Sequence, residues 1–183
     1  MYHSGNQLVD PHVLFAKAHL QAGMHVADFG CGRTGHIIFP AAKILGERSV
    51  IYAVDILKDV LEEIRKRAAS NSILSIHPVW ANVETVGATA IPEKSLDVIF
   101  LVNILWHARD CATMLCEARR LLKDKGRLVI VDWRSAALPF GPPSDRIVNK
   151  EAVREWGNKE GCVIQEEFAA GPYHWGIVLF KQD

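Results

Sequence analysis

Three glycines directly follow an apolar run, and their spacing suits a chain that turns closely around a small ligand. Gly30, Gly32 and Gly35 come straight after residues 24–29, and a helical pattern follows them. Glycine lets the backbone approach a ligand that a side chain would keep away, and the start of a helix offers free N–H groups to a negative or polar group. The stretch, which also contains Cys31, therefore predicts a site for a nucleotide-like cofactor.

Asp28 narrows the choice of cofactor, because it lies two residues before the first glycine. A carboxylate at that point would repel a pyrophosphate, whereas it would attract the cationic amino group of a methionine moiety. The alternative is structural: Asp28 accepts hydrogen bonds from the amides of the turn and only braces it. Of the two roles, the pattern favours binding.

A second acidic residue, Asp55, ends the next predicted strand, twenty residues after Gly35. In a strand–helix–strand unit, a carboxylate at this place can accept hydrogen bonds from both hydroxyls of a ribose. Asp55 could instead cap the helix that follows, but Lys58 and Asp59 lie closer to the start of that helix. Ile56 comes directly after Asp55 and is placed to pack on an adenine face.

Strands and helices alternate along most of the chain, and this alternation must position those residues. Apolar runs predict strands, apolar stripes at helical spacing predict helices, and the short connection between the last two strands allows only an antiparallel pair. We therefore expect an α/β fold of the Rossmann-like, doubly wound kind, with a mainly parallel seven-stranded sheet, one antiparallel strand from a C-terminal hairpin, and helices on both faces. The predicted strands are residues 24–29, 49–54, 75–79, 96–102, 127–131, 163–168 and 174–180, and the predicted helices are residues 11–21, 37–45, 59–70, 111–122 and 150–160.

Length and composition exclude several classes of protein. The 183 residues suit one domain, and their 21 basic and 21 acidic side chains balance, so the chain lacks the positive field that extended nucleic acid usually requires. No basic and apolar leader opens the sequence, and no uncharged apolar stretch is long enough to span a membrane. The four cysteines match no zinc or redox spacing. We expect a single domain over residues 1–183, located in the cytoplasm, with reduced thiols and no bound metal.

Several segments together carry a resemblance to a known family. They are GMHVADFGCG at residues 23–32, YAVD at 52–55, SLDVIF at 95–100 leading into NILWH at 103–107, and KGRLVIVD at 125–132. From Gly23 to Phe180 the chain resembles a class I S-adenosylmethionine (SAM)-dependent methyltransferase, and it is similar to the small-molecule branch that includes the ubiquinone/menaquinone-type C-methyltransferases. The resemblance implies SAM as the cofactor and a small, partly apolar molecule as the methyl acceptor.

The resemblance also implies a role for individual residues around the cofactor. Asp28 and the glycine turn, with Cys31 and Gly35, would form the methionine side, Asp55 would hold the ribose, and Asn103 would face the methionine end. The family usually has an Asp after the third strand to bind the adenine amine, where this chain has Asn82. Because an Asn side-chain oxygen also accepts a hydrogen bond, Asn82 and the backbone of Val83 are carried over to that role. The third glycine of the turn comes one residue later than is usual.

Few catalytic side chains are expected, because methyl transfer from a sulfonium depends mainly on positioning and a dry site. His107 follows the fourth strand and is the candidate base, although a structural role in which it bonds the neighbouring loop, as the family often shows near this position, is the favoured explanation. His174 could reach the site from the hairpin, but we expect a satisfied histidine at a sheet edge. Four tryptophans near strand ends could line an apolar acceptor pocket, but they are expected mainly in the core: Trp80, Trp106, Trp133 and Trp175.

Other functions stay open at this point. A Rossmann dehydrogenase would explain the glycines but would leave Asp28 without a role. The chain could also be a non-catalytic SAM-binding protein, or an RNA or protein methyltransferase that acts with a partner subunit. Nucleic acid alone is disfavoured as a partner, and no residue pattern predicts an oligomeric state. Residues 1–22 are expected to form an N-terminal helix and lid, with Tyr2 and His3 over the cofactor.

Overall fold

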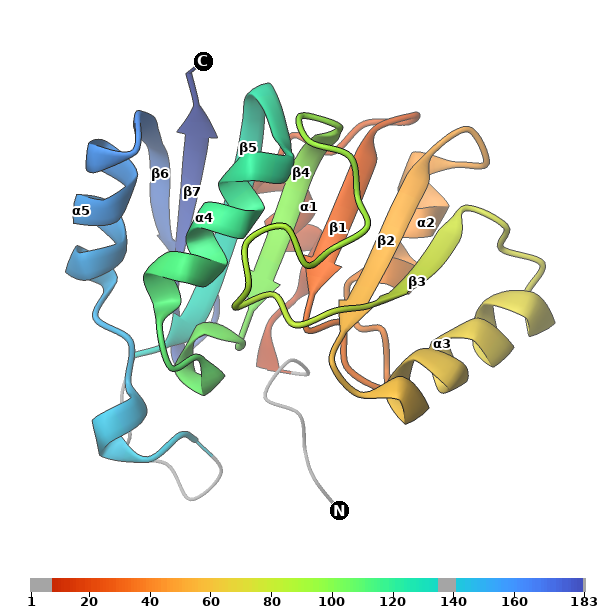
Figure 1. The fold of residues 1–183 in the computed structure, drawn as a ribbon, viewed down its shortest axis with the longest axis horizontal. Helices are drawn as coiled ribbons and strands as arrows, with labels where there is room; N and C mark the ends of the chain where they lie inside the picture. Colours follow the sequence, from red (N-terminus) through yellow and green to blue (C-terminus); the bar gives the residue numbers. More distant parts are fainter. Residues whose placement is uncertain (1–7, 135–140, 183) are drawn as a thin grey trace.

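The computed structural model describes residues 8–134 and 141–182 and shows one seven-stranded sheet. The strand order is β3-β2-β1-β4-β5-β7-β6, and β7 runs antiparallel to both of its neighbours while the other pairings are parallel (Figure 1). This confirms the predicted sheet with one reversed strand. The strands are β1 (His25–Phe29), β2 (Val50–Asp55), β3 (Ile76–Trp80), β4 (Leu96–Val102), β5 (Leu122–Trp133), β6 (Cys162–Ala169) and β7 (His174–Lys181).

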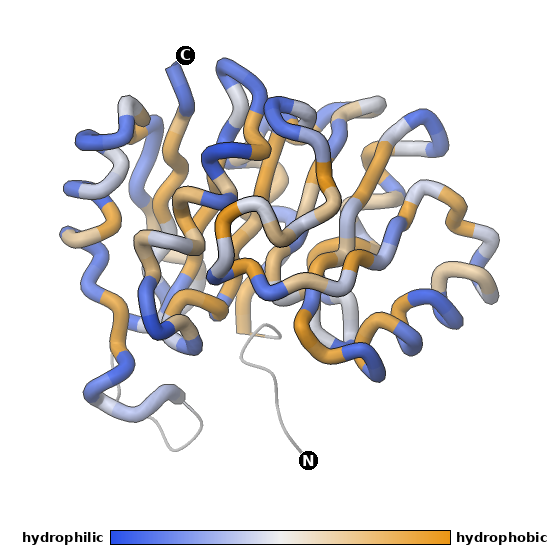
Figure 2. The backbone as a smooth tube through the Cα atoms, viewed as in Figure 1, coloured by the Kyte–Doolittle hydropathy of each residue, from blue (hydrophilic) through white to orange (hydrophobic). Residues whose placement is uncertain are grey.

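Helices cover both faces of the sheet and form two hydrophobic cores. Apolar residues of α1, α2 and α3 pack with one face, and those of α4 and α5 pack with the other. In Figure 1, α1 and α2 lie behind the sheet and α4 lies in front of it. Figure 2 shows the hydrophobic colours concentrated along the central strands. The helices are α1 (Pro11–Lys17), α2 (Ile38–Leu45), α3 (Lys58–Ser70), α4 (Cys111–Leu121) and α5 (Lys150–Lys159), with short 3₁₀ helices η2 (Leu105–His107) and η3 (Ser144–Arg146).

Two element boundaries differ by four or more residues from those predicted. The first helix ends at Lys17 rather than at residue 21, and His19 then takes the left-handed φ of 52°. Strand β5 begins at Leu122, because the residues predicted as a turn are absorbed into the strand as an irregularity where Lys125 has a φ of 66°. In contrast, α2 accommodates Pro40 without distortion, since the helix starts at Ile38 and its first turn needs no N–H from that position.

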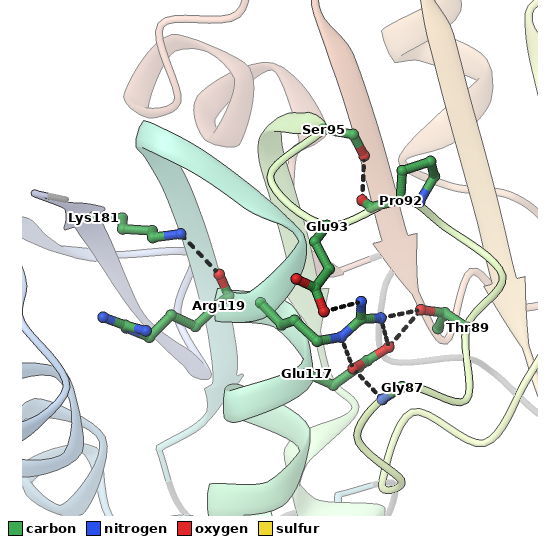
Figure 3. Close-up of polar contacts among 9 residues, drawn as sticks. Gly87, Thr89, Pro92, Glu93, Ser95, Glu117, Arg119 and Lys181 are labelled. Atoms are coloured by element: carbon green, nitrogen blue, oxygen red, sulfur yellow. Dashed lines mark hydrogen bonds and ion pairs between the residues drawn. The ribbon is translucent and has the colours of Figure 1, made fainter.

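A buried ionic cluster holds the connection between β3 and β4 against α4. Glu117 is fully buried, and its carboxylate accepts hydrogen bonds from the Gly87 amide at 2.7 Å, from two Arg120 nitrogens at 2.8 Å, and from the Thr89 hydroxyl (Figure 3). Burial alone would raise the pKa of Glu117, but these donors outweigh burial and lower it to about 2. The cluster therefore stabilises the packing of this connection on α4, and the charge of Glu117 is paired with that of Arg120.

No helix in the described ranges is long and apolar enough to cross a membrane. The predicted lid residues Tyr2 and His3 lie outside the described residues. Strands β1, β2 and β4 end at one edge of the sheet, and β7 begins at that edge because it runs in the opposite direction. The predicted binding residues follow these strand ends.

Candidate functional site

Asp28 is a buried acid near the carboxyl end of β1, and it makes no ion pair or hydrogen bond among the described residues. Its side chain is only 3% exposed. Burial, and then the nearby negative charge of Asp55, raise the pKa of Asp28 well above its ordinary value. The alternative in which Asp28 braces the glycine turn by accepting its amides is therefore not what the structure shows. A cation entering this edge would supply the missing compensation.

The glycine turn offers space rather than free N–H groups. The Gly30 and Cys31 amides donate to the Val54 carbonyl at 2.8 and 3.1 Å, and the Gly32 amide donates to Asp55 Oδ2 at 3.1 Å. These three amides are thus satisfied by β2, whereas the free N–H groups predicted at the start of the following helix stay a prediction. Gly32 has a φ of 60°, and a Cβ there would meet nothing closer than the Gly30 carbonyl oxygen at 4.0 Å. The turn therefore leaves an open cradle beside Gly32.

Gly30 is held tightly by the segment that follows β4. A Cβ at Gly30 would lie 2.1 Å from Ile104 Cδ1, so only glycine fits there, and Gly30 also has a φ of 72°. The neighbouring Asn103 is 9% exposed and has a left-handed φ of 54°. Its backbone N–H donates to the Val131 carbonyl at 2.8 Å. Asn tolerates this conformation better than most residues. Ile104 was missed by sequence reasoning, because only the fold brings it to the glycine turn.

Asp55 connects the glycine turn to the start of α3. Its Oδ2 accepts the Gly32 amide, and its Oδ1 accepts the Leu57 amide at 3.0 Å. Asp55 thus orders the turn into α3 without being its N-cap residue, which is Leu57. Each carboxylate oxygen can accept a second hydrogen bond, so two ribose hydroxyls remain compatible with this geometry.

An exposed aromatic residue supports the predicted adenine side. Trp80, at the end of β3, is 59% exposed, and its indole N–H donates to the Ile56 carbonyl at 2.8 Å. The Lys58 ammonium lies 4.4 Å from the centre of the Trp80 ring. Ile56 itself is 56% exposed, so its side chain is accessible to an adenine ring. Trp80 is therefore a neighbour of the adenine side and not a core residue.

Asn82 and Val83 follow β3 and approach the segment after β4 through Glu84. The Asn82 side-chain oxygen accepts the Glu84 amide at 3.0 Å, and the Glu84 carboxylate accepts the Arg109 amide at 2.7 Å. Val83 is buried, whereas Asn82 is exposed. The Asn82 oxygen keeps one lone pair for a ligand amine. Glu84 was missed because its contact spans two loops that the sequence does not relate.

His107 lies at the surface at the end of η2, and its ring stacks on Trp106 with centroids 3.6 Å apart. Partial desolvation lowers the pKa of His107, the positive charge of Arg146 lowers it further, and the negative charge of Asp55 raises it. The pKa of His107 therefore depends on the charges of both Asp55, on the predicted cofactor side, and Arg146. It is positioned beside the site as a neutral imidazole at neutral pH.

His174 differs from its expected setting as a satisfied edge residue. It opens β7, which lies between β5 and β6, and it is fully buried. Neither ring nitrogen has a hydrogen-bond partner among the residues that the structure describes, and the ring lies 4.3 Å from that of Trp133. Burial lowers the pKa of His174 to about 4. The expectation failed because the hairpin inserts its second strand into the sheet.

Two further groups in this region have altered acidity. Burial raises the pKa of Asp132 to about 7, although the backbone amides of Trp133, Trp106 and Leu105 act in the opposite direction. Burial also raises the pKa of the Cys31 thiol, so this cysteine is a poor nucleophile. All four cysteines are free. Within residues 8–134 and 141–182, no group of three or more His, Cys, Asp or Glu side chains could hold a metal, and the absence of a metal stays a prediction.

The residues present fit SAM. The molecule combines a cationic amino group, a ribose and an adenine, and the edge of the sheet offers the uncompensated carboxyl of Asp28, the half-buried carboxylate of Asp55, and the exposed apolar face of Ile56. The open space beside Gly32 adjoins Asp55, whose carboxylate accepts the Gly32 amide. Pyrophosphate would fit less well, because it would face two carboxylates.

Comparisons with known proteins agree with this geometry. A family model described as a methyltransferase domain matches residues 20–171. Aklanonic acid methyltransferase DauC of Streptomyces sp. (strain C5) is 30% identical over 135 residues, which are 73% of this chain and 60% of that protein. Nocamycin O-methyltransferase of Saccharothrix syringae is 26% identical over 172 residues, or 94% of this chain and 48% of that protein. This chain thus spans only 60% and 48% of the lengths of these relatives.

A solved structure shows the same fold. The crystal structure of a SAM dependent methyltransferase from Aquifex aeolicus matches with a TM-score of 0.83 at 21% identity, covering 97% of this chain and 92% of that one. The likeness confirms the Rossmann-like arrangement of the sheet and helices. The narrower resemblance to the ubiquinone/menaquinone-type branch stays a prediction.

Proposed function

Because this chain belongs to the methyltransferase domain family, whose cofactor is SAM, we propose that it transfers the methyl group of SAM to a small, partly apolar acceptor. The observation that carries the proposal is the buried, uncompensated carboxyl of Asp28 beside the open glycine turn. A cationic amino acid moiety is the ligand group that this environment favours. We extend the proposal to residues 1–183 as a single domain.

Each side chain binds a different part of SAM. Asp28 accepts hydrogen bonds from the amino group, with Cys31 and Gly35 in the surrounding turn, and Asp55 accepts hydrogen bonds from the ribose hydroxyls. Ile56 and Val83 enclose the adenine, Asn82 accepts its amine, and Asn103 faces the methionine end. When bound, SAM supplies an electrophilic methyl group on a sulfonium, which an acceptor attacks in line.

His107 is the side chain available to take a proton from an acceptor that must lose one. Its lowered pKa keeps it neutral and able to accept at neutral pH. The relatives support a small organic acceptor, since one is named for aklanonic acid and the other for nocamycin. A pure structural role for His107 predicts that His107→Gln leaves methyl transfer intact while a catalytic role predicts its loss.

Calorimetry with the full chain tests the cofactor. We expect SAM to bind and a nicotinamide dinucleotide not to bind, and preference for the dinucleotide would end the proposal. Asp55→Ala should weaken SAM binding by about 1–3 kcal/mol, because buried ribose hydroxyls lose their acceptor. Asp59→Ala is the matched control, since Asp59 lies four residues after Asp55, is exposed, and pairs with Arg33.

Two alternatives predict different results in a methyl-transfer assay with labelled SAM. Tight SAM binding without transfer to any member of a broad panel of small organic acids and phenols would favour a non-catalytic SAM-binding protein. Transfer only to RNA or protein, together with a stoichiometric copurifying subunit, would favour a methyltransferase that acts with a partner. Transfer to a small acceptor by the purified chain alone supports the proposal over both.

A further inference from the structure

A cavity of about 560 Å³ lies outside the predicted cofactor residues, on the face of the sheet covered by α4 and α5. Its walls come from η2, the start of α4, η3 and the residues after it, and the first half of α5. This volume falls within the range of sites that take drug-sized molecules, roughly 300–1,000 Å³. Nothing in the proposed binding of SAM uses this space.

The lining is apolar and aromatic in the middle and positively charged at the rim. Trp106 and Trp156 contribute indole rings, and Leu115 and Val153 contribute aliphatic surface. Among the described residues of the lining, the two arginines Arg109 and Arg146 outnumber the single acid, Asp145, and all three are exposed. A flat, largely apolar molecule with a negative group is complementary to this combination.

Two polar groups in the lining lack a strong partner. The Trp156 indole nitrogen is buried without a hydrogen-bond acceptor in the part of the chain that the structure describes. Arg146 makes one long hydrogen bond, from Nη1 to the Ala108 carbonyl at 3.4 Å. The Arg146 guanidinium therefore keeps N–H donors for a ligand oxygen at the rim of the cavity, where an anion would form charge-assisted hydrogen bonds.

The cavity and the predicted cofactor side share a wall. Trp106 lines the cavity, and its ring stacks on His107, the next residue of η2. His107 senses both Arg146, at the cavity rim, and Asp55, on the cofactor side. A ligand in the cavity would therefore lie one short turn of chain away from the residues assigned to SAM.

We propose that this cavity holds the ring system of the methyl acceptor, and that the acceptor is a planar organic anion such as an aromatic carboxylate. Its identity as the acceptor rests on the proposed function. Arg146 and Arg109 bind the anion, and Trp106 and Trp156 enclose its rings.

An acceptor that binds as an anion changes what the chain must do. The oxygen already carries the electron pair that forms the O–CH₃ bond, and the pair of the breaking S–CH₃ bond stays on sulfur. No proton is released, so no side chain has to act as a base. The positive rim of the cavity then replaces general-base catalysis by His107.

Calorimetry with anthracene-2-carboxylate and its neutral analogue 2-(hydroxymethyl)anthracene tests the inference on the full chain. Wild type should bind the carboxylate at least about tenfold more tightly than the alcohol, since the arginine pair adds a charge-assisted contact. Arg146→Gln should remove most of this preference. Ala152→Trp, at an exposed lining position of α5, should fill the cavity and abolish binding of both compounds.

Matched controls lie on α3, away from the cavity. Arg65→Gln and Ala69→Trp make the same changes at exposed positions and should bind both compounds as wild type does. Equal affinity for the carboxylate and the alcohol, or unchanged binding to Ala152→Trp, would overturn the inference. So would wild-type self-association that Ala152→Trp abolishes, because it would assign the cavity to a second copy of the chain.

Calorimetry with SAM on the same variants separates this inference from the proposed function. If wild type binds SAM but does not prefer the carboxylate to the alcohol, the acceptor site alone is overturned. Absence of SAM binding to wild type overturns the proposed function, whatever the cavity binds. SAM binding should be the same in wild type, Arg146→Gln and Ala152→Trp.

Discussion

Two buried carboxyl groups on opposite faces of the sheet differ in their hydrogen-bond partners and in the direction of their pKa shifts. Glu117 accepts four hydrogen bonds within the chain, and its pKa falls to about 2. Asp28 accepts none among the described residues, lies near another acid, and has a raised pKa. Burial is similar for both, so the partners make the difference. A buried carboxyl group with hydrogen-bond donors stabilises the fold, and one without donors indicates where a cationic group of a ligand binds.

Removing Glu117 should give the largest effect. Glu117→Ala leaves the largely buried Arg120 without its main partner, and we expect unfolding by urea to show a loss of about 3–5 kcal/mol. Glu93→Ala is the control, because Glu93 pairs with the same arginine but is 70% exposed, and its loss should stay below about 1 kcal/mol. Similar losses in both variants would contradict a structural role specific to the buried acid.

The same comparison predicts opposite responses to acid. The native pKa of Glu117 lies below its unfolded value, so its stabilisation is complete above about pH 4.5 and is lost as pH falls towards 2. The loss amounts to about 3 kcal/mol, and Glu117→Gln should not show it. For Asp28 the native pKa is raised, so any advantage of Asp28→Asn at neutral pH should shrink as the pH falls. Urea unfolding across this range measures both.

Neutralising Asp28 should separate binding from stability. Asp28→Asn should weaken SAM binding by about 2–3 kcal/mol, or up to a hundredfold, because the cationic amino group loses its charged partner. The unliganded variant should be at least as stable as wild type, since it removes a buried acid without compensation. A variant that loses stability but keeps its affinity for SAM would reverse the roles assigned to the two acids.

The smallest expected effect concerns His107. Arg146→Gln should raise the pKa of His107, because it removes a neighbouring positive charge, and Asp55→Asn should lower it for the opposite reason. Both shifts should be small, since both charges act through solvent. Proton NMR titration of the imidazole measures the shifts. Shifts of the same sign would contradict the electrostatic influence assigned to one of the two groups.

Much of the fold follows from local patterns in the chain. The continuous apolar run of residues 96–102 predicts β4 with its observed bounds, because a strand buried on both faces needs no polar alternation. The predicted start of β5 was wrong, since the strand absorbs Asp124, Lys125 and Gly126 as an irregularity at which its register with β4 shifts. The place of β7 inside the sheet could not be derived either, because a hairpin can add to a sheet in either order.

The candidate site divides in the same way. Asp28, Asp55 and the glycines lie at strand ends, so their types and spacing suffice to predict them. Contacts such as Ile104 against Gly30, Glu84 with the Arg109 amide, and the cavity between α4 and α5 depend on segments that meet only in the folded chain. No local pattern encodes them, because packing between distant segments selects them.

The close approach of Ile104 to Gly30 restricts how this scaffold can be re-engineered. A foreign loop grafted between β4 and α4 must place a side chain of about the size of Ile104 at position 104, and residue 30 must remain glycine. Libraries that randomise this loop to obtain new acceptor preferences will lose cofactor affinity first wherever position 104 becomes bulky or charged. Selection for SAM retention before selection for new substrates would therefore preserve the most usable variants.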